Sequence, residues 1–430
     1  MSNSKDGIGE VGKVKSPISK QKNDKWLLKN IVFIVSSGDF YNLDRNVLQS
    51  KSSLDILYGD ITLDESPSKT IAYSNQKLIA DYVGWMPTSE SIFTYDGNKY
   101  LNTYRPPSIK PVKGDVSEWL ELLNFIYGEH SDLVVQHMAF TLQRPDKKIR
   151  WQLLVHGAPR TGKTMTIKPL NMILGNSSAV IDNDRFEEGW GDIYWQKKAL
   201  LFEEVMQDNM KQFNRLKAKL ANDNIEQLNL KSRGMGTQRN LYSMYMFSNH
   251  ENALRFNADE NKLLVIKAPD HCINGTPENS AAFYKSLGDK IDDSQEFHSA
   301  CYHYLMNVDI SNFNYGTLPV KTDAMHKMVE ASRPEYEKRL SEWIEDEKFT
   351  ISNRFFSIDD VMTDLKGLGH SCSKSKVSAF LKSKEYESYQ AQKKINGRKE
   401  SYRFWTKDEV CKSLSPSELY SFYEVERYKK

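Results

Sequence analysis

The stretch GAPRTGKT, residues 157–164, constrains the fold of this chain more than any other part of its sequence. An apolar run, RWQLLVHG, leads into it, and an amphipathic run, GKTMTIKPLNMILG, continues from it. The stretch fits the pattern G-x-x-x-x-G-K-[ST], whose backbone N–H groups converge on phosphate oxygens between a strand and a helix. Gly157 and Gly162 permit backbone angles and close approaches that a Cβ atom would obstruct. We therefore expect an α/β fold that binds a nucleoside triphosphate at this loop.

The positions of this loop have separate expected roles. Lys163 is expected to reach the β- and γ-phosphates, and the Thr164 hydroxyl to complete the coordination shell of a Mg²⁺ ion. Pro169 lies inside the predicted helix and should kink it or end its regular part early. The expected contacts to ATP are the residues of the loop: Gly157, Ala158, Pro159, Arg160, Thr161, Gly162, Lys163 and Thr164.

Two further apolar runs end in polar residues suited to hydrolysis. The run KALLFEEV carries Glu203 and Glu204, and the run MYMFSNH carries Asn249. An ATPase needs one acid near the metal ion and another that polarises the attacking water. We assign Glu203 to the Mg²⁺ shell, Glu204 to the general base and Asn249 to the orientation of the water. Two solvated glutamates after a buried strand are the ordinary interpretation, but their order after the loop favours a catalytic pair.

Length and composition limit the class of protein. The 430 residues are enough for two or three domains, and 39% apolar residues suffice for packed cores. No run approaches the ~18 apolar residues of a membrane span, and the N-terminus has no apolar segment typical of a secretory signal. We expect a soluble intracellular protein without membrane contact. The four cysteines form no C-x-x-C pair, which argues against a disulfide framework and a structural zinc site.

Turn signals and changes of period divide the chain into segments. DVSEWLELLNFIYG and SDLVVQHMAFTLQRP predict helices, the first with Asp115 as its N-cap. Strands are predicted at RWQLLVHG, KKALLFEEV, LYSMYMFSNH and KLLVIKAP, and a helix at FNRLKAKLAND. The expected segments are a flexible tail at 1–24, a small α+β module at 25–111, a helical segment at 112–150, an α/β nucleotide-binding core at 151–270, a helical closing segment at 271–345, a basic module at 346–412 and a tail at 413–430.

The basic module has its own pattern. Net charge of the chain is only +2, but residues 374–403 hold nine Lys and Arg against three Glu. Two helices, with Ser357 and Ser373 as caps, and a hairpin at the ING turn predict a winged helix. It would bind DNA, although such folds also serve protein contacts. Its candidate DNA contacts are Lys374, Lys376, Lys382, Lys393, Lys394, Arg398 and Lys399.

The order of GAPRTGKT, LLFEE, LKAKLANDNIEQLNLKSRG and FSNHENALRF resembles the superfamily 3 helicases of viruses, phages and plasmids. Their phage and poxvirus-type primase–helicase branch is the most similar, over residues 30–339. The resemblance implies an AAA+-type ATPase core behind a helical collar, assembled as a hexameric ring that pulls single-stranded DNA through its centre. It also implies work on forked DNA in phage or mobile-element replication, in the cytoplasm of the host cell, beside a primase or polymerase domain or other replication proteins.

The resemblance assigns two more segments. A pore hairpin in that family matches NIEQLNLKSRGMGTQRNLY, so Lys231, Arg233 and Arg239 are candidate DNA contacts, and cations near a turn also suit a sequence-blind motor. Lys217 and Lys219 on the preceding helix are weaker candidates. An arginine finger is expected just before the last core strand, where this chain has Lys262. Lysine offers a point charge but not a bidentate contact, and Arg255 is the alternative.

Three functions remain open from the sequence. The first is an ATP-dependent DNA helicase. The second is the helicase half of a primase-polymerase–helicase, whose polymerase domain would lie upstream. The third is an ATP-switched replication initiator or loader without strong unwinding, which the missing arginine favours. The hydrolysis set of Glu203, Glu204 and Asn249 favours a motor.

Overall fold

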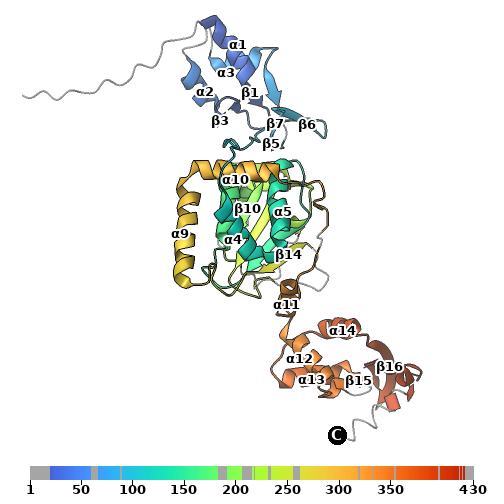
Figure 1. Ribbon diagram of the computed structural model, residues 1–430. Helices are drawn as coiled ribbons and strands as arrows, with labels where there is room; N and C mark the ends of the chain where they lie inside the picture. Colours follow the sequence, from blue (N-terminus) through green and yellow to red (C-terminus); the bar gives the residue numbers. More distant parts are fainter. Residues whose placement is uncertain are drawn as a thin grey trace, which may run out of the picture. The chain divides into compact units, whose positions relative to one another are not determined.

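The computed structural model describes residues 20–421 except 60–65, 88–89, 183–190, 206–215, 217, 231–233, 255–261, 318–319, 332, 353–354, 396–397, 416 and 419. The described residues divide into two compact units, one up to Lys327 and one from Met328 onward (Figure 1). Within the described part of the chain, no helix combines the length and the apolar character needed to cross a membrane.

The first unit opens with a four-stranded sheet in the order β3-β2-β1-β4. Three helices pack on this sheet, and the core between helices and sheet contains Leu27, Ile31 and Leu54. The first helix begins at Lys20, inside the segment that the sequence assigned to the tail. The elements are α1 (Lys20–Asn30), β1 (Ile31–Ile34), β2 (Phe40–Asn42), β3 (Val47–Gln49), α2 (Lys51–Tyr58), α3 (Pro67–Tyr73) and β4 (Leu78–Ala80).

A second sheet joins this N-terminal part to the hairpin that the sequence predicted. Its order is β11-β12-β5-β7-β6. β11 and β12 form the predicted antiparallel hairpin, and β12 pairs in parallel with β5, with Thr237 beside Gly84. The sequence did not indicate this pairing, because the two strands come from distant parts of the chain. The bounds are β5 (Tyr82–Trp85), β6 (Ile92–Tyr95), β7 (Asn98–Asn102), β11 (Ile225–Leu230) and β12 (Gly234–Arg239).

The centre of the first unit is a five-stranded sheet in the order β14-β8-β13-β10-β9, and all neighbouring strands are parallel. Four of these strands confirm the predicted runs, whereas β9 was not predicted. The sheet is buried, and its strands are correspondingly apolar. The bounds are β8 (Gln152–His156), β9 (Ser178–Ile181), β10 (Ala199–Phe202), β13 (Ser243–Ser248) and β14 (Leu263–Lys267).

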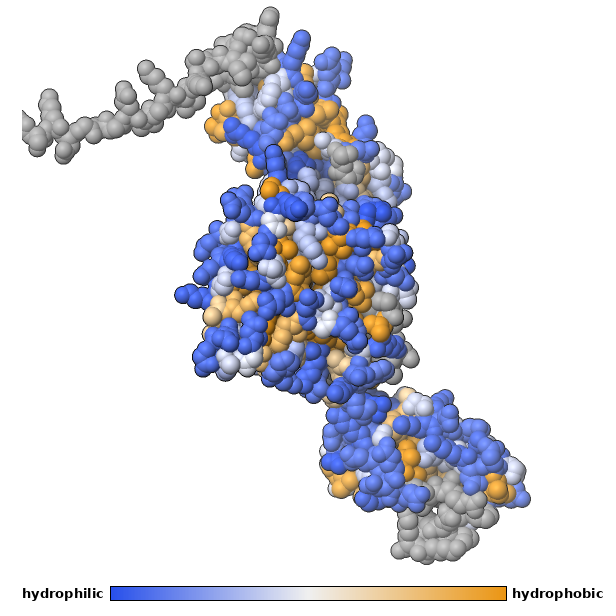
Figure 2. All heavy atoms as spheres, viewed as in Figure 1, coloured by the Kyte–Doolittle hydropathy of each residue, from blue (hydrophilic) through white to orange (hydrophobic). Residues whose placement is uncertain are grey.

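Helices cover one face of this parallel sheet, and α4 and α5 lie in front of it in Figure 1. Trp119, Val155 and Tyr245 belong to the shared core. In the view of Figure 2, apolar residues gather over the middle of this part within a hydrophilic border. The bounds are α4 (Ser117–Tyr127), η2 (Gly128–His130), α5 (Ser131–Gln143), η3 (Thr164–Thr166), α6 (Lys168–Leu174), η4 (Gly175–Ser177), η5 (Gly191–Ile193), α9 (Pro277–Asp293) and α10 (Gln295–Asn307).

The helix α4 is confirmed, but its N-cap is Val116, so the assignment of Asp115 is wrong. Asp115 lies one residue earlier, where its Oδ1 still accepts the N–H of Ser117 at 2.9 Å. Of the helix predicted for FNRLKAKLAND, residues 216 and 218–220 are helical, and residues 213–215 and 217 lie outside the described part of the chain.

The second unit holds two helices followed by a long hairpin. β15 joins the hairpin in the sheet order β15-β17-β16, and Trp405 and Phe356 are fully buried against the helices. Ser357 and Ser373 cap α13 and α14, as predicted. The bounds are α11 (Asp323–Ala331, which begins in the first unit), α12 (Glu335–Glu345), η6 (Thr350–Ser352), β15 (Phe355–Ser357), α13 (Ile358–Gly367), α14 (Lys374–Ser383), β16 (Glu387–Ile395), β17 (Arg398–Thr406) and α15 (Glu409–Lys412).

Candidate nucleotide-binding site

The loop 157–164 follows directly on β8, and its conformation explains both glycines of the pattern. Gly157 has a φ of +146°, and a Cβ there would lie 3.1 Å from the Cβ of Ala268 and 3.2 Å from its carbonyl oxygen. Gly162 has a φ of +80°, and a Cβ there would lie 2.6 Å from the ring of Tyr284. Side chains with a Cβ rarely adopt such angles, so this loop requires glycine at both ends.

The backbone after the loop differs from the prediction. Thr164–Thr166 forms a short 3₁₀ turn, η3, and α6 begins only at Lys168, with Pro169 in its first turn. A proline in the first turn costs no helical hydrogen bond, because the N–H groups there have no partner inside the helix. Pro169 therefore lies at the start of the regular helix, and the expectation that it ends or kinks that helix is wrong. Trp119 Nε1 fixes the turn by donating to the Thr166 carbonyl oxygen at 2.8 Å.

The Lys163 side chain is turned toward the carbonyl groups of its own loop. Its Nζ donates to the carbonyl oxygens of Gly157 at 2.8 Å and Ala158 at 2.6 Å, and to Asn249 Oδ1 at 3.2 Å. The residue is only 7% exposed. Burial lowers the pKa of this ammonium, while the nearby Glu204 carboxylate acts in the opposite direction. Lys163 is thus a desolvated cation at the base of the loop.

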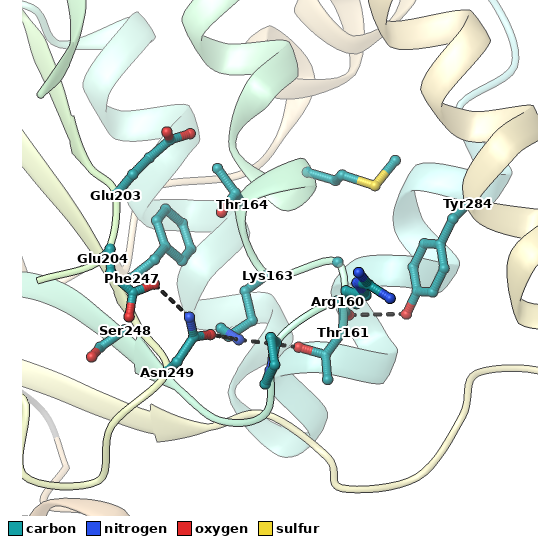
Figure 3. A pocket seen from close by; sticks show the side chains of 13 residues that line it. Arg160, Thr161, Lys163, Thr164, Glu203, Glu204, Phe247, Ser248, Asn249 and Tyr284 are labelled. Carbon is teal, nitrogen blue, oxygen red and sulfur yellow. Dashed lines mark hydrogen bonds between the residues drawn. The ribbon is translucent and has the colours of Figure 1, made fainter. Parts of the chain in front are cut away.

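The end of β10 supplies the two carboxylates. Glu204 has a φ of +52°, an uncommon angle for a residue other than glycine, and this turn aims its side chain at Asn249. Asn249 Nδ2 donates to Glu204 Oε2, so the amide of Asn249 links Glu204 to Lys163. His250 Nε2 lies 3.6 Å from Glu204 Oε1. In Figure 3, Glu203 points away from Glu204, on the side of Thr164.

These groups line one cavity of about 590 Å³. The sequence predicted most of its polar lining but missed Tyr284 on α9, whose hydroxyl donates to the Thr161 carbonyl oxygen at 2.9 Å (Figure 3). No local pattern marked this tyrosine, since it approaches the loop from a helix more than a hundred residues later. The lining residues are Pro159, Arg160, Thr161, Gly162, Lys163, Thr164, Met165, Glu203, Glu204, Phe247, Ser248, Asn249 and Tyr284.

The donor set fits a magnesium nucleotide. Among the described residues, no group of three or more His, Cys, Asp or Glu side chains is placed to hold a metal ion. Mg²⁺ at nucleotide sites needs no such group, because it takes one or two protein oxygens and completes its shell with phosphates and waters. The Thr164 hydroxyl and the Glu203 carboxylate are hard oxygen donors of this kind, and both line the cavity.

Lys262, the candidate for the role of the arginine finger, lies at the opposite end of the strands from the loop. It immediately precedes β14, whose register with β8 sets Leu263 opposite Gln152 and Lys267 opposite His156. At ~3.3 Å per residue over six residues, this places its backbone about 20 Å from Gly157, the start of the loop. Lys262 is therefore remote from the cavity of its own chain and could serve only that of another. Arg255 lies outside the described residues.

The structure describes only some of the candidate DNA contacts of the β11–β12 hairpin. Lys231 and Arg233, at the turn, lie outside the described residues. Arg239 lies opposite Ile225 at the other end of the hairpin, and its guanidinium is 3.6 Å from Asp223 Oδ2. Among the weaker candidates, Lys217 also lies outside the described part, and Lys219 pairs with Glu226 at 3.1 Å. Arg239 and Lys219 thus have acidic partners near the hairpin base.

Two buried lysines donate hydrogen bonds to residues 240–242, which follow β12 and form the base of the β11–β12 hairpin. Lys148 Nζ donates to Asn240 Oδ1 at 2.9 Å and to the Tyr242 carbonyl oxygen at 2.6 Å. Lys198 Nζ donates to the Leu241 carbonyl oxygen at 2.6 Å. Lys198 is 1% exposed, and burial lowers its pKa from 10.5 to about 7. Both lysines precede strands of the parallel sheet, so they connect that sheet to residues 240–242 at the end of β12.

The candidate cations of the second unit lie on α14 and on the hairpin. Lys374 Nζ pairs with Asp359 Oδ1 on α13, and Lys376 and Lys382 are exposed. The other candidates belong to β16 and β17, where Lys394 is opposite Lys399. Their side chains are outside the part of the chain that the structure describes; these residues are Lys393, Lys394, Arg398 and Lys399.

No protein-family model matches the chain, and neither does any curated protein. The fold is similar to the apo structure of the NrS-1 C-terminal region, residues 305–718 of that protein. The TM-score is 0.64 and the identity 17%, over 89% of this chain and 99% of the other. An A-form structure of the same region gives 0.64 and 17%, over 90% and 99%.

A JCV helicase structure also matches, with a TM-score of 0.32 and 9% identity over 54% of this chain and 66% of the other. A likeness this low does not establish a shared fold. The similarity to the NrS-1 region, at 17% identity, shows the fold alone. Together with the loop after β8, the parallel sheet makes this a mixed α/β protein with a P-loop NTPase-like arrangement.

Proposed function

We propose that this chain is an ATP-dependent helicase that translocates on single-stranded DNA, in the replication of a phage or mobile element. One observation carries the proposal: Lys163, Glu204 and Asn249 meet in one cavity at the ends of the adjacent strands β8, β10 and β13. A cation, a carboxylate and an amide in mutual contact are the groups that triphosphate hydrolysis requires. A purely structural loop would have no need of all three.

In the proposed reaction, the ammonium of Lys163 exchanges its contacts with the Gly157 and Ala158 carbonyl oxygens for the β- and γ-phosphates. Asn249 holds a water by hydrogen bonding, and Glu204 accepts a proton from it as its oxygen attacks the γ-phosphorus. The bond from that phosphorus to the bridging oxygen of ADP breaks. A Mg²⁺ ion, which Thr164 and Glu203 would hold, supplies neutralisation of the negative charge on the phosphate oxygens.

The DNA contacts of the proposal come from two places. The turn of the β11–β12 hairpin carries Lys231 and Arg233, and backbone-directed cations suit a motor that moves regardless of sequence. In the second unit, two helices followed by a hairpin support a winged-helix domain, in which α14 enters a groove and the hairpin contacts the backbone. Its exposed Lys376 and Lys382 are the described candidates for that contact.

The proposed assembly is a ring, hexameric by resemblance to superfamily 3 helicases. The position of Lys262 supports assembly, because this lysine is about 20 Å from the loop of its own chain at ~3.3 Å per residue. In a ring it would approach the triphosphate of the neighbouring chain. A native mass measurement with an ATP analogue and DNA tests this, and a strict monomer under those conditions would contradict it.

The central test is ATP hydrolysis with and without single-stranded DNA, in wild type and Lys163→Ala. We expect DNA to stimulate hydrolysis by the wild type and the variant to lose at least about a hundredfold in rate, by analogy with the loss of one charge-stabilising donor. Lys147→Ala, which removes an exposed lysine that does not line the cavity, is the control. A hydrolysis rate that single-stranded DNA does not change, or that Lys163→Ala retains, would contradict the proposal of a DNA-translocating helicase.

Two alternatives have specific support. Lysine instead of arginine before β14 favours an ATP-switched initiator, since an arginine finger is worth about 10³-fold or more in rate. ATP-dependent oligomerisation without strand displacement on forked DNA would select it. The similar NrS-1 structure covers residues 305–718 of a longer protein, which is compatible with the second alternative, the helicase half of a primase-polymerase–helicase. Primer synthesis by the present chain alone would contradict that division of roles.

A further inference from the structure

One face of the sheet β11-β12-β5-β7-β6 carries four aromatic side chains. The register places Tyr82 and Phe93 beside Tyr100 on the neighbouring strands, so all three project from one face. Tyr95 lies two residues after Phe93 on β6 and projects from the same face. We call these four residues, Tyr82, Phe93, Tyr95 and Tyr100, the aromatic platform.

The rings of the platform contact one another around Tyr100. The ring centroids of Phe93 and Tyr100 are 5.4 Å apart with planes at 11°, and Tyr82 lies 5.4 Å from Tyr100. Gly84 leaves room for this arrangement, because a Cβ there would lie 2.8 Å from the Phe93 ring. Tyr100 is only 9% exposed, whereas Tyr82 and Tyr95 are 44% and 45% exposed. The outer rings therefore cover the central one and still face solvent.

The hydrophobic core of this module lies on the opposite face of the same strands. Leu101 is fully buried there with Val32 and Ile34, and Val83 and Ile92 pack against them. The platform therefore lies on the face of the sheet that does not pack against this hydrophobic core. Grouped, half-exposed aromatic rings on one sheet face are a feature of binding surfaces.

The platform is continuous with the proposed DNA hairpin. Gly84, over which Phe93 and Tyr100 lie, is the pairing partner of Thr237 on β12. Thr237 is three residues from Gly234, the first residue of β12 after the turn, which corresponds to about 10 Å along the strand. A DNA strand bound near Gly234 would therefore reach the platform within a few nucleotides.

The chemistry of the platform selects bases over phosphates. The side chains of β5, β6 and β7 on this face are aromatic or amide in character, and all of them lie in the described part. Burial raises the pKa of Tyr100, and the nearby Asp96 and Asp81 carboxylates raise it further. Carboxylates repel a phosphate backbone, whereas aromatic rings stack on any unpaired base. Bases within a duplex already stack on each other, so only a single strand offers them.

We propose that the aromatic platform stacks on unpaired bases of single-stranded DNA that runs along the β11–β12 hairpin. The inference rests on the proposed function, since it takes single-stranded DNA as the substrate. The platform would add base stacking, from the N-terminal module, to the phosphate contacts proposed for the hairpin. The hairpin contributes charge, which is lost at high salt, and the platform contributes stacking, which is not.

The test is the affinity for a dye-labelled oligothymidylate, measured by fluorescence anisotropy for the full chain. We expect the double variant Tyr82→Ala, Tyr95→Ala to raise Kd about tenfold, corresponding to one lost stacked base at about 1.4 kcal/mol. The factor should be the same at low and high salt. Tyr82→Phe with Tyr95→Phe should bind as the wild type does. Tyr73→Ala, which removes a tyrosine that is 77% exposed and outside the platform, is the matched control.

An abasic oligonucleotide with the same backbone separates stacking from charge. Wild type and the double alanine variant should bind it equally, because it offers no base to the rings. Equal affinity of both for oligothymidylate, or equal loss in Tyr73→Ala, would overturn the platform. If the wild type binds no single strand at all, the proposed function fails with it. Binding and DNA-stimulated hydrolysis that survive the double variant unchanged would overturn the platform alone.

Discussion

The nucleotide cavity and the hairpin sheet are built in different ways. At the cavity, Lys163, Glu204 and Asn249 each follow closely on their own strand, and the strands are parallel neighbours. The hairpin sheet instead joins β12 to β5, two strands from distant segments, through the pairing of Thr237 with Gly84. The cavity therefore arises from one repeated local pattern, and the hairpin sheet from a tertiary contact. It follows that the cavity and the hairpin sheet can be altered separately.

The first prediction concerns the cavity and has the largest effect. Glu204→Gln keeps the side-chain size and a hydrogen-bond partner for Asn249 but removes the proton acceptor. We expect kcat for ATP hydrolysis to fall about 10²- to 10⁴-fold, the usual range for a general base. Binding of a fluorescent ATP analogue should remain unchanged.

Its companion variant is Glu203→Gln. Here the expected change is a higher Mg²⁺ concentration for half-maximal hydrolysis, because one oxygen ligand is weakened. If Glu204→Gln turned over at the wild-type rate, or if the two variants exchanged these phenotypes, the roles assigned at the end of β10 would be wrong. Neither variant should change the thermal stability of the hairpin sheet.

The second prediction concerns the hairpin sheet. Gln238 is buried; its Oε1 accepts the Gln196 N–H at 2.8 Å, and its Nε2 donates to the Tyr194 carbonyl oxygen at 2.8 Å. Gln238→Ala leaves both backbone groups without this partner, which costs about 1–3 kcal/mol. We expect the free energy of unfolding of the first unit to fall by about 2 kcal/mol, measured by urea denaturation.

The control is Gln227→Ala in the same hairpin, because Gln227 is exposed. We expect a change within about 0.5 kcal/mol for this variant. Hydrolysis without DNA should be the same in both variants. A large loss of hydrolysis in Gln238→Ala, with stability intact, would mean that the cavity and the hairpin sheet are not separable.

The third prediction uses pH to examine the hairpin base. Lys198 has a pKa of about 7 in the folded chain, lowered by burial, against 10.5 for an ordinary lysine. Between these values it is neutral when folded and charged when unfolded, so unfolding takes up a proton. The free energy of unfolding should therefore rise with pH from about 7 to about 10.5, with a slope of at most ~1.4 kcal/mol per pH unit from this residue.

Lys198→Met should reduce this slope, and Lys147→Met, an exposed neighbour, should leave it unchanged. The measurement is the urea midpoint of each protein at both ends of the pH window. An identical slope in Lys198→Met and wild type would show that the buried amine stays charged in the folded chain. The hairpin base would then be held by a cation instead of a neutral amine.

The cavity could be anticipated from sequence because its signals are local. Glycines at both ends of the loop, two acids after one apolar run and an asparagine after another each mark the end of a strand. Tyr284 could not be anticipated, since nothing near it in the sequence records that α9 crosses the loop. The same holds for Pro169, whose role depended on where the 3₁₀ turn η3 ended.

The sequence by itself determined the loop conformation at Gly157 and Gly162 and the polar residues at the ends of β10 and β13, and its resemblance to a helicase family indicated the hairpin β11–β12. Backbone angles and alternating burial depend on neighbouring residues, so a local pattern suffices for them. Only the tertiary structure decided that β12 pairs with β5, that Lys148 and Lys198 support the hairpin base, and that four aromatic rings share one face. Such contacts join residues far apart in the chain, and their stability comes from burial and hydrogen bonding that exist only after folding.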